Sequence, residues 1–347
     1  MKTVLVTGVQ GQDGSILADK YLAKGWKVVG IDLWKPTGIY PNIKEAIKHP
    51  NFTLETGECT DSEWLYHIFQ TYKPDLVYHM AANSLVPESF KIPRRIMDVN
   101  NNSTLNLLEI IRYYFPKTKI YFAASSEMFG KVGTPFQSLD TPFIPNSPYA
   151  ISKVTSFHFI RLYREAYGLF AVNGVLFNHE GIRRGPNFVT RKITRGVANI
   201  NYYNQEYIEL GNLDVYRDWG NAEDYVDAMI LMMEANKPED YIVATGKMHS
   251  VRQFIEEAFR QIGMTIIWEG KGLEEIGKDQ NGNIRIKINP KYYRPAEVYQ
   301  LCGDYTKTEE KLHWKPKTNF KELVSIMVNN DIFIVSKETP EKIPRWL

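Results

Sequence analysis

Short apolar runs alternate along the first half of the chain with segments in which apolar residues recur at helical spacing. The short runs predict strands at 3–7, 27–31, 51–55, 75–79, 120–122 and 171–177. The helical spacing predicts helices from about residue 15 onward and at 62–72, 94–114 and 148–167. Strands and helices that alternate in this way form a parallel sheet with right-handed crossovers. The pattern therefore predicts an α/β fold built on a Rossmann-type doubly wound parallel sheet.

The second half of the chain has a less regular pattern. After about residue 178 it shows short helices, short strands and a polar, glycine-containing stretch at 271–286. We expect this half to form a smaller C-terminal α/β substrate lobe over the carboxyl ends of the strands. The predicted division is a Rossmann domain at 1–177 and a lobe at 178–347, with the chain crossing back to the first domain around 210–245.

Composition excludes several classes of protein. The 347 residues are 44% hydrophobic and 24% charged, which are ordinary values for a globular protein. A net charge of +2 gives no general reason to expect a nucleic acid or a membrane as partner. No apolar run approaches the ~18 residues that a membrane span needs, and Met1 leads directly into the first strand. Cys59 and Cys302 cannot build a disulfide framework or a zinc site, so we expect reduced thiols, no metal and a cytoplasmic location.

A glycine-rich turn follows the first predicted strand. Gly8, Gly11 and Gly14 lie between this strand and an amphipathic helix. Glycines at this spacing make a tight turn, let the backbone approach a pyrophosphate and let the helix pack on the strand. The anion would lie at the N-terminus of the helix. The turn therefore predicts a dinucleotide site.

Proton-handling groups collect around the strand at 120–122 and the helix at 148–167. Tyr149 and Lys153 lie one helical turn apart on one face, so the ammonium can lower the pKa of the phenol. Ser125, Ser126 and Glu127 follow the strand, at the edge where catalytic groups of open α/β sheets collect. Tyr149 is thus a candidate acid/base.

The glycine-rich turn and the Tyr/Lys pair together resemble the extended short-chain dehydrogenase/reductase superfamily. Three regions narrow the resemblance to the GDP-mannose 4,6-dehydratases: FNHEGIRRGPNFVTRK at 177–192, RDWG and DYVDA at 217–220 and 224–228, and YYRPAEV at 292–298. The first of these departs from the family at Gly181 and Ile182. The similarity spans nearly the whole chain.

The resemblance implies an NAD(P)-dependent hydro-lyase that converts GDP-mannose to GDP-4-keto-6-deoxymannose, a step of deoxysugar biosynthesis in the GDP-fucose pathway. Tyr149 would remove the O4 proton while a hydride leaves C4. Glu127 would then take the C5 proton and protonate the departing C6 hydroxyl. Hydride returns to C6, so the cofactor would be tightly bound and regenerated at each turnover.

The resemblance also assigns residues to three sets. The catalytic set is Ser125, Glu127, Tyr149 and Lys153. The cofactor-binding set is Gly8, Gln10, Gly11, Gln12, Asp13, Gly14, Asp32, Glu58, Cys59, Ala81, Ala82, Ser84, Tyr149, Lys153, His179 and Arg184. The substrate-binding set is Ser84, Ser125, Ser126, Asn178, Val189, Lys192, Arg217, Arg294 and Glu297.

For the choice between NAD and NADP, the residues of this chain and the family resemblance point to different dinucleotides. The family usually has an arginine pair and a longer loop after the second strand, which suits NADP. Here Asp32 stands at the strand end, where a carboxylate binds the ribose hydroxyls and repels a 2′-phosphate. Lys35 and His49 are the nearby cations, and they do not form an arginine-pair arrangement. The residues favour NAD.

Charged residues in the second half suit a nucleoside diphosphate. Lys192, Arg217 and Arg294 are interpreted as isolated cations, with each arginine able to fork onto two phosphate oxygens. Glu297 could accept hydrogen bonds from ribose hydroxyls or from guanine. The sugar stays open between mannose and a relative such as a manno-heptose.

Two other functions compete with the dehydratase. A nucleotide-sugar 4-epimerase or reductase needs the Tyr/Lys pair and the dinucleotide but has no use for a C5 base such as Glu127. A non-catalytic regulator on the same fold has no reason to retain Ser125, Glu127, Tyr149 and Lys153 together.

Assembly is predicted from two helices. Family members pair through two helices per subunit, here those at 94–114 and 148–167. We expect a homodimer that buries the outward faces of Phe157, Ile160 and Tyr163. A homotetramer is the further assembly that the family forms.

Overall fold

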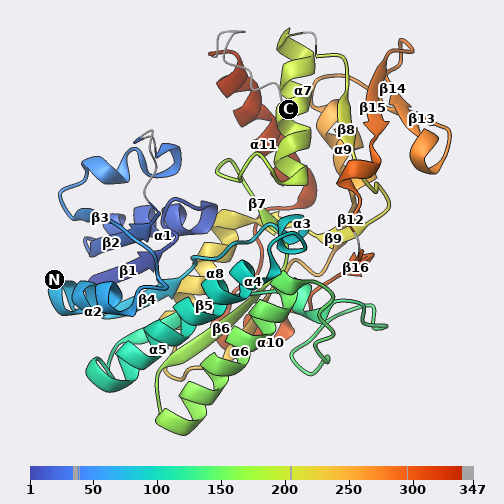
Figure 1. Cartoon of the computed structure of the whole chain (residues 1–347). Coiled ribbons are helices and arrows are strands. Elements are labelled where there is room, and N and C mark those ends of the chain that lie inside the picture. The colour runs from blue at the N-terminus through green and yellow to red at the C-terminus, as the bar shows by residue number, and fades with distance from the viewer. Residues whose placement is uncertain (34–37, 39, 204, 295, 338–347) are drawn as a thin grey trace.

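The computed structural model of the chain is shown in Figure 1, and it describes residues 1–33, 38, 40–203, 205–294 and 296–337. A parallel sheet of seven strands forms the centre of this described part, in the order β11-β6-β5-β4-β1-β2-β3. The strands are β1 (Thr3–Thr7), β2 (Lys27–Asp32), β3 (Phe52–Thr56), β4 (Leu76–His79), β5 (Lys119–Ser125), β6 (Ala171–Leu176) and β11 (Asp240–Val243). The strand order reverses between β1 and β4, where open sheets bind ligands at their carboxyl ends. The predicted Rossmann-type sheet is confirmed.

Helices cover both faces of this sheet. On one face α1 (Gln12–Ala23) packs beside α8 (Ala222–Glu234), and both contribute to a core that includes Leu17 and Met229. On the other face lie α2 (Ser62–Tyr72), α5 (Ser103–Tyr114) and α6 (Pro148–Tyr167), around a core that includes Ile160. The strands are therefore buried on both sides, which explains why they appear in the sequence as continuous apolar runs.

The segment predicted as one helix over 94–114 is three elements. It contains α4 (Pro93–Met97), a π-helical turn (Asp98–Asn102) and α5, and it follows the short helix α3 (Val86–Ser89). In the turn, the side chains of Asn100 and Asn101 donate hydrogen bonds to Oγ and to the carbonyl of Ser152, at 2.9 and 2.7 Å. Asparagine is a weak helix former because its side chain competes for hydrogen bonds. The prediction of one regular helix is therefore wrong at this turn.

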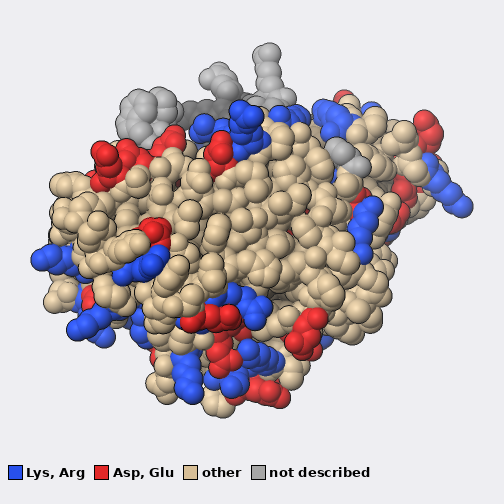
Figure 2. Space-filling view, turned by 60° about the horizontal axis from the view of Figure 1, so that its bottom comes forward, with Lys and Arg blue, Asp and Glu red and all other residues tan. Residues whose placement is uncertain are grey.

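The outward apolar face of α6 is not the one that we predicted. Phe157, Ile160 and Tyr163 are buried within the chain, because they lie on the stripe of α6 that faces the sheet. Leu162 on α6 and Tyr113 on α5 are instead 50% and 62% exposed. Figure 2 brings the underside of Figure 1, with α5 and α6, forward, and uncharged side chains cover most of its centre.

The second half builds a smaller lobe beside the sheet, at the upper right of Figure 1. Its helices are α7 (Val189–Tyr203), α9 (Val251–Arg260) and α11 (Phe320–Val335), whereas α10 (Thr306–Leu312) packs against β11 and α8 on the large sheet. Its strands are β7 (His179–Glu180), β8 (Ile208–Leu210), β9 (Tyr216–Asp218), β10 (Gly220–Asn221), β12 (Met248–Ser250), β13 (Ile267–Glu269), β14 (Ile276–Lys278), β15 (Ile284–Ile288) and β16 (Gln300–Leu301). In the two halves of the chain together, short 3₁₀ turns lie at Pro41–Ile43, Ala46–Lys48, Ser126–Phe129, Gly272–Glu274 and Pro290–Tyr292.

A separate core holds this lobe together. It joins α7, α9 and α11 to β8 and β15 through residues such as Val197, Phe254 and Met327. Between β10 and β12 the chain returns to the large sheet, because β11 pairs in parallel with β6. The β9 strand pairs with β12 and β16, which brings the segments around 217 and 300 side by side.

Candidate active site

The glycine-rich turn lies at the carboxyl end of β1. Gly8 has a φ of +70°, and a Cβ on it would lie 2.9 Å from the backbone of Ala81. A Cβ on Gly14 would lie 2.4 Å from the carbonyl oxygen of Gly8, so α1 packs closely on the turn. Gly11 is the N-cap of α1, and its N–H donates to the Gly8 carbonyl at 3.0 Å. This narrow turn at a helix N-terminus fits the pyrophosphate of a dinucleotide.

The Asp32 carboxylate lies at the end of β2, beside this turn. It accepts hydrogen bonds from the N–H groups of Gln10 and Leu33, both at 2.8 Å. Bonds from backbone N–H groups favour the ionised form of a carboxyl. A negative charge therefore stands where the adenosine ribose of a dinucleotide is expected. Lys35 lies outside the described residues.

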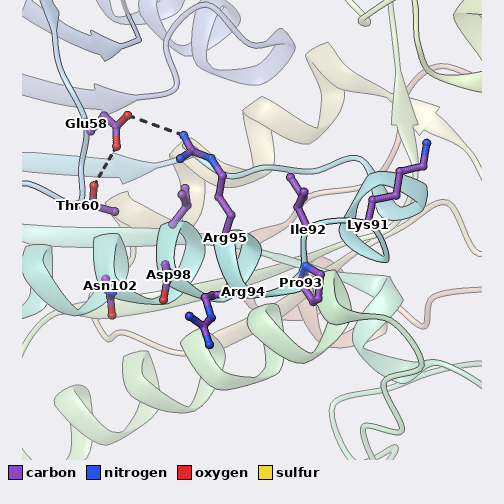
Figure 3. Close-up of a pocket in the computed structure, with 10 residues that line it drawn as sticks. Glu58, Thr60, Lys91, Ile92, Pro93, Arg94, Arg95, Asp98 and Asn102 are labelled. Atoms are coloured by element: carbon purple, nitrogen blue, oxygen red, sulfur yellow. Dashed lines mark hydrogen bonds and ion pairs between the residues drawn. The ribbon is translucent and has the colours of Figure 1, made fainter.

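A pocket of about 550 Å³ lies next to the predicted adenine end of the site (Figure 3). It is lined by Glu58, Thr60, Lys91, Ile92, Pro93, Arg94, Arg95, Asp98, Val99 and Asn102. Figure 3 shows Arg95 turned toward Glu58, with 3.9 Å between Nη2 and Oε1. Burial raises the pKa of the neighbouring Cys59 thiol to about 12, so this cysteine stays protonated near neutral pH. Glu58 and Cys59 thus lie together at this end.

The loop after β4 lies across the turn from β1. The N–H of Ala81 donates to Oγ1 of Thr7 at 3.1 Å, and Thr7 in turn contacts Nδ1 of His79 at 2.9 Å. These bonds hold the loop close to Gly8. Ala82 is half-buried and Ser84 is exposed. Because its side chains are small, a ligand at the sheet edge can come close to the backbone of this loop.

The candidate catalytic residues meet at the carboxyl end of β5 and the start of α6. Ser125 ends β5 and its Oγ accepts a hydrogen bond from the N–H of Glu127 at 3.3 Å. Ser126 and Glu127 lie in the 3₁₀ turn that follows, and both are buried. Ser147 caps α6, with Pro148 and Tyr149 as its first residues. The structure therefore brings Ser125, Glu127 and Tyr149 together.

The pKa of Tyr149 is shifted in the direction opposite to the one that the sequence predicts. Burial raises it to about 12, against a hydrogen bond from Ser125 that lowers it. Burial also lowers the pKa of Lys153 to about 7, and its Nζ donates to the carbonyl of Ala123 at 2.7 Å. Nζ lies 5.8 Å from the centre of the Tyr149 ring. The predicted lowering by Lys153 is therefore wrong for the chain by itself, because desolvation disfavours both charged forms.

Arginines and carboxylates form an ionic cluster beside Glu127. Nη1 of Arg294 lies 3.2 Å from Oε1 of Glu127 and 3.9 Å from Oε1 of Glu297. Nη2 of Arg217 lies 3.4 Å from the same Glu297 oxygen. Burial lowers the pKa of Arg217, whose side chain is 5% exposed. The interpretation of Arg217 and Arg294 as isolated cations is therefore wrong, since both are paired.

Two further ion pairs lie near the site, one that joins the second half to α1 and one within the second half. Oδ2 of Asp13 on α1 lies 2.8 Å from Nε2 of His179, and Nδ1 of His179 lies 2.8 Å from the Phe177 carbonyl. Burial lowers the pKa of His179, but Asp13 and the bond to the Phe177 carbonyl together raise it above its ordinary value. Nε of Arg184 lies 2.9 Å from the buried carboxylate of Glu180. His179 and Arg184 are thus held at the glycine-rich turn and the start of the lobe.

Two of the remaining predicted substrate residues, Val189 and Lys192, lie in the first turn of α7, and the third, Asn178, directly precedes β7. Val189 begins this helix and is 38% exposed. Nζ of Lys192 lies 3.5 Å from the centre of the Tyr292 ring, so a cation and an aromatic face are adjacent. The carbonyl of Asn178 accepts a hydrogen bond from the N–H of Gly220 at 2.9 Å. These residues border the lobe side of the site.

Sequence reasoning missed the residues that hold α6 in place. Asn100 and Asn101 bond Ser152, and Asn101 also donates to Oγ of Ser156 at 2.8 Å. Both contacts lie within the first turns of the helix that carries Tyr149 and Lys153. The signal was three consecutive asparagines inside a predicted helix, where such residues are disfavoured.

Two features are absent from the described residues. No cluster of three or more His, Cys, Asp or Glu side chains in them could hold a metal ion. No helix in the described ranges is long and apolar enough to cross a membrane. Cys59 and Cys302 are both free thiols.

Comparison with known proteins gives consistent matches. The family model described as GDP-mannose 4,6 dehydratase matches residues 5–327. The chain is similar to GDP-mannose 4,6 dehydratase 2 of Caenorhabditis elegans, at 45% identity over 346 residues, covering 97% of this chain and 91% of the relative. It is similar to the GDP-mannose 4,6 dehydratase of Homo sapiens, at 45% identity over 337 residues, covering 94% and 91%.

A solved structure supports the fold. The dTDP-glucose 4,6-dehydratase of Bacillus anthracis, in complex with NAD, superposes with a TM-score of 0.79. The two chains are 22% identical, and the match covers 95% of this chain and 96% of the other.

Proposed function

Because the chain belongs to the GDP-mannose 4,6-dehydratase family, we propose that Tyr149 and Glu127 are the two proton-transfer groups of its reaction. The protein is a hydro-lyase that uses a nicotinamide dinucleotide and converts GDP-mannose to GDP-4-keto-6-deoxymannose. The observation that carries the assignment of residues is the cluster of Ser125, Glu127 and Tyr149 at the carboxyl end of β5. A simple 4-epimerase has no use for the carboxylate in this cluster.

The chain's residues divide the reaction between them. Tyr149 takes the proton from O4 of the sugar, with the Ser125 hydroxyl beside it to bond the same oxygen. When bound, the nicotinamide ring accepts the hydride that leaves C4 and returns it at C6. Glu127 removes the proton at C5, which the new ketone acidifies, and the same carboxyl protonates the C6 hydroxyl that leaves as water. A proton then returns to C5, which balances the proton that Tyr149 took from O4.

Three regions of the chain support binding of the ligands. The turn at Gly8, Gly11 and Gly14, together with Gln10, Gln12 and Asp13, would hold the dinucleotide at the N-terminus of α1. Arg217 and Arg294 would hold the diphosphate, and Glu297 the ribose or the guanine. We assign the nucleotide sugar mainly to residues 178–347.

NAD is the dinucleotide that we propose. The Asp32 carboxylate is held by two backbone N–H groups at the end of β2. A 2′-phosphate at this place would meet like-charge repulsion, whereas the free ribose hydroxyls can donate to the carboxylate. Mass analysis of the dinucleotide released by denaturing the protein tests this choice, and NADP at full occupancy would contradict it.

A homodimer through α5 and α6 is the proposed assembly, with a tetramer as the higher form. Leu162, Ile151 and Tyr113 expose apolar surface on these two helices, and a second copy would bury it. Sedimentation at micromolar concentration would contradict the dimer if it gave a monomer. A cytoplasmic location is proposed because both cysteines are free thiols, which suits a reducing compartment.

The reaction itself is tested by incubating the purified protein with GDP-mannose and measuring the molecular mass of the nucleotide sugar by mass spectrometry. We expect a product lighter by one water, formed without added dinucleotide. A product of unchanged mass would indicate epimerisation and contradict the dehydration. Loss of water from a GDP-manno-heptose but not from GDP-mannose would contradict mannose as the sugar.

A further inference from the structure

We propose that Arg294 positions the carboxylate of Glu127, so that one guanidinium links the diphosphate of the substrate to the base that acts at C5. This inference rests on the proposed role of Glu127. It begins from one contact: Nη1 of Arg294 lies 3.2 Å from Oε1 of Glu127, although the two residues are 167 positions apart. The side chains are 25% and 10% exposed, so the pair lies at the wall of the site.

Glu127 depends on this contact for the direction of its carboxylate. The backbone of Glu127 is fixed, because its N–H donates to Oγ of Ser125 and it lies in a 3₁₀ turn. Among the described residues, Arg294 is the one that donates a hydrogen bond to the carboxylate. A glutamate side chain has three rotatable bonds, and a charge-assisted bond is the kind of contact that selects one rotamer. Arg294 therefore decides where the basic oxygen lies.

Arg294 also has donors left for the substrate. A guanidinium carries five N–H donors in one plane. Both contacts of Arg294 with described carboxylates, Glu127 and Glu297, run through Nη1. The remaining edge can bind phosphate oxygens in the forked arrangement that arginine favours.

The chemistry of a nucleotide sugar brings its two reacting ends within the reach of one side chain. The diphosphate is attached at C1, C1 is bonded to the ring oxygen, and the ring oxygen is bonded to C5. The C5 proton is therefore only a few bonds from the anion. A guanidinium seated between the diphosphate and the C5 base aligns them in a single contact.

Arg217 provides a matched comparison in the same cluster. Its Nη1 donates to the carbonyls of Val298 and Tyr216, at 2.7 and 2.9 Å, and its Nη2 lies 3.4 Å from Glu297. Arg217 is thus held by backbone and by Glu297, and it is attracted by the charge of Glu127 without a hydrogen bond to it, whereas Arg294 donates a hydrogen bond to the base itself. If Arg294 served only to bind the diphosphate, conservative changes at the two arginines would have the same consequence.

The test compares Arg294→Lys with Arg217→Lys at saturating GDP-mannose. Reactions are quenched during turnover, and the nucleotide sugars are separated by molecular mass and quantified by mass spectrometry. A sugar oxidised at C4 but not yet dehydrated is lighter than the substrate by two hydrogens, and the final product is lighter by one water. We expect Arg294→Lys to raise the ratio of the oxidised sugar to the final product and to lower kcat by ~10- to 100-fold, as misplacement of a reacting group does. Arg217→Lys should raise KM and leave the ratio at the wild-type value.

The ratio also separates this proposal from its premise. Glu127→Gln serves as the reference, because it should give the highest ratio of all. If Glu127→Gln accumulates the oxidised sugar and Arg294→Lys does not, Arg294 is a diphosphate contact only and the positioning role is overturned. If Glu127→Gln dehydrates normally, the proposed function of Glu127 fails and the inference falls with it.

A loss of folding cannot imitate the expected result. The ratio is measured only on sugar that an active molecule has already oxidised, so unfolded protein does not contribute. As a second measurement, Arg294→Ala should show a larger ratio than Arg294→Lys, and added guanidinium ions should bring the ratio back toward the wild-type value. A ratio that guanidinium leaves unchanged while restoring substrate affinity would overturn the positioning role.

Discussion

The two proposed proton-transfer groups lie in opposite electrostatic settings. Tyr149 and Lys153 come from one helix and are buried, with burial raising the pKa of the tyrosine to about 12 and lowering that of the lysine to about 7. Glu127 lies in a cluster of both signs, with Arg294 at 3.2 Å and Glu297 beside the same arginine. Burial disfavours the charged forms of Tyr149 and Lys153, whereas Glu127 has a counter-ion in Arg294.

The difference shows how each group can be tuned. At the Tyr/Lys pair the dominant influence is desolvation, so a positive charge that arrives with the dinucleotide can act on the phenol with little competition. At Glu127 the arginine sets the direction of the carboxylate. The protonation of Tyr149 therefore depends on the bound dinucleotide, whereas the orientation of Glu127 depends on an arginine of the second half of the chain.

The largest effect is expected from Tyr149→Phe. Removal of the phenol eliminates the base for O4 but leaves the Glu127 cluster intact, so product formation should fall by ~10² to 10⁴-fold without any oxidised sugar. Quenched reactions analysed by mass would show this. Tyr163→Phe is the control, because Tyr163 lies on the same helix and bonds Glu109 away from the site. Accumulation of oxidised sugar in Tyr149→Phe would show that another group removes the O4 proton.

A smaller effect concerns the buried ammonium of Lys153. Its pKa is about 7 in the folded chain against 10.5 ordinarily, so between these pH values the unfolded chain binds more protons. The free energy of unfolding should therefore rise with pH relative to Lys153→Met, by on the order of a few kcal/mol in all. Denaturant unfolding of both proteins, stripped of dinucleotide, at several pH values from 7 upward would test this. A constant difference between them would show that the ammonium is better solvated than its burial indicates.

The smallest effect is expected at Asp32, a carboxylate that accepts hydrogen bonds from two backbone N–H groups. Asp32→Asn keeps the shape and removes the charge, so its preference for NAD over NADP should fall by about tenfold, which corresponds to ~1.4 kcal/mol. Competition binding of the two dinucleotides gives the ratio. Asp61→Asn is a suitable control, since Asp61 is an exposed carboxylate that caps α2. An unchanged ratio in Asp32→Asn would mean that other residues select the dinucleotide.

Much of the first half could be predicted because its signals are local. The glycine-rich turn lies within a few residues of β1 and α1, and Tyr149 and Lys153 are separated by one helical turn. The π-helical turn was missed, since helical periodicity does not show where asparagine side chains bond a neighbouring helix such as α6. The stripe of α6 that meets the sheet differs from the prediction because Ile151 and Leu162 place apolar side chains on the other stripe too, and only packing decides which one is buried.

The ionic cluster could not be predicted from spacing. Arg294 meets a partner 167 positions away, and Arg217 meets Glu297 across 80 positions. The pairing arises because β16 lies beside β9, and the 3₁₀ turn after β5 contacts β16. Near-neutral net charge says nothing about such pairs. The sequence likewise shows which groups titrate but not how deeply they are buried, which is what reversed the expectation for Tyr149.

The central claim is that Glu127 acts at C5 after Tyr149 has acted at O4. The most direct measurement is the mass of the nucleotide sugars formed by Glu127→Gln from GDP-mannose. We predict that a sugar lighter by two hydrogens builds up to at most one molecule per bound dinucleotide, because the hydride stays on the nicotinamide, while loss of water slows by ~10² to 10⁴-fold. Loss of water at near the wild-type rate would contradict the account.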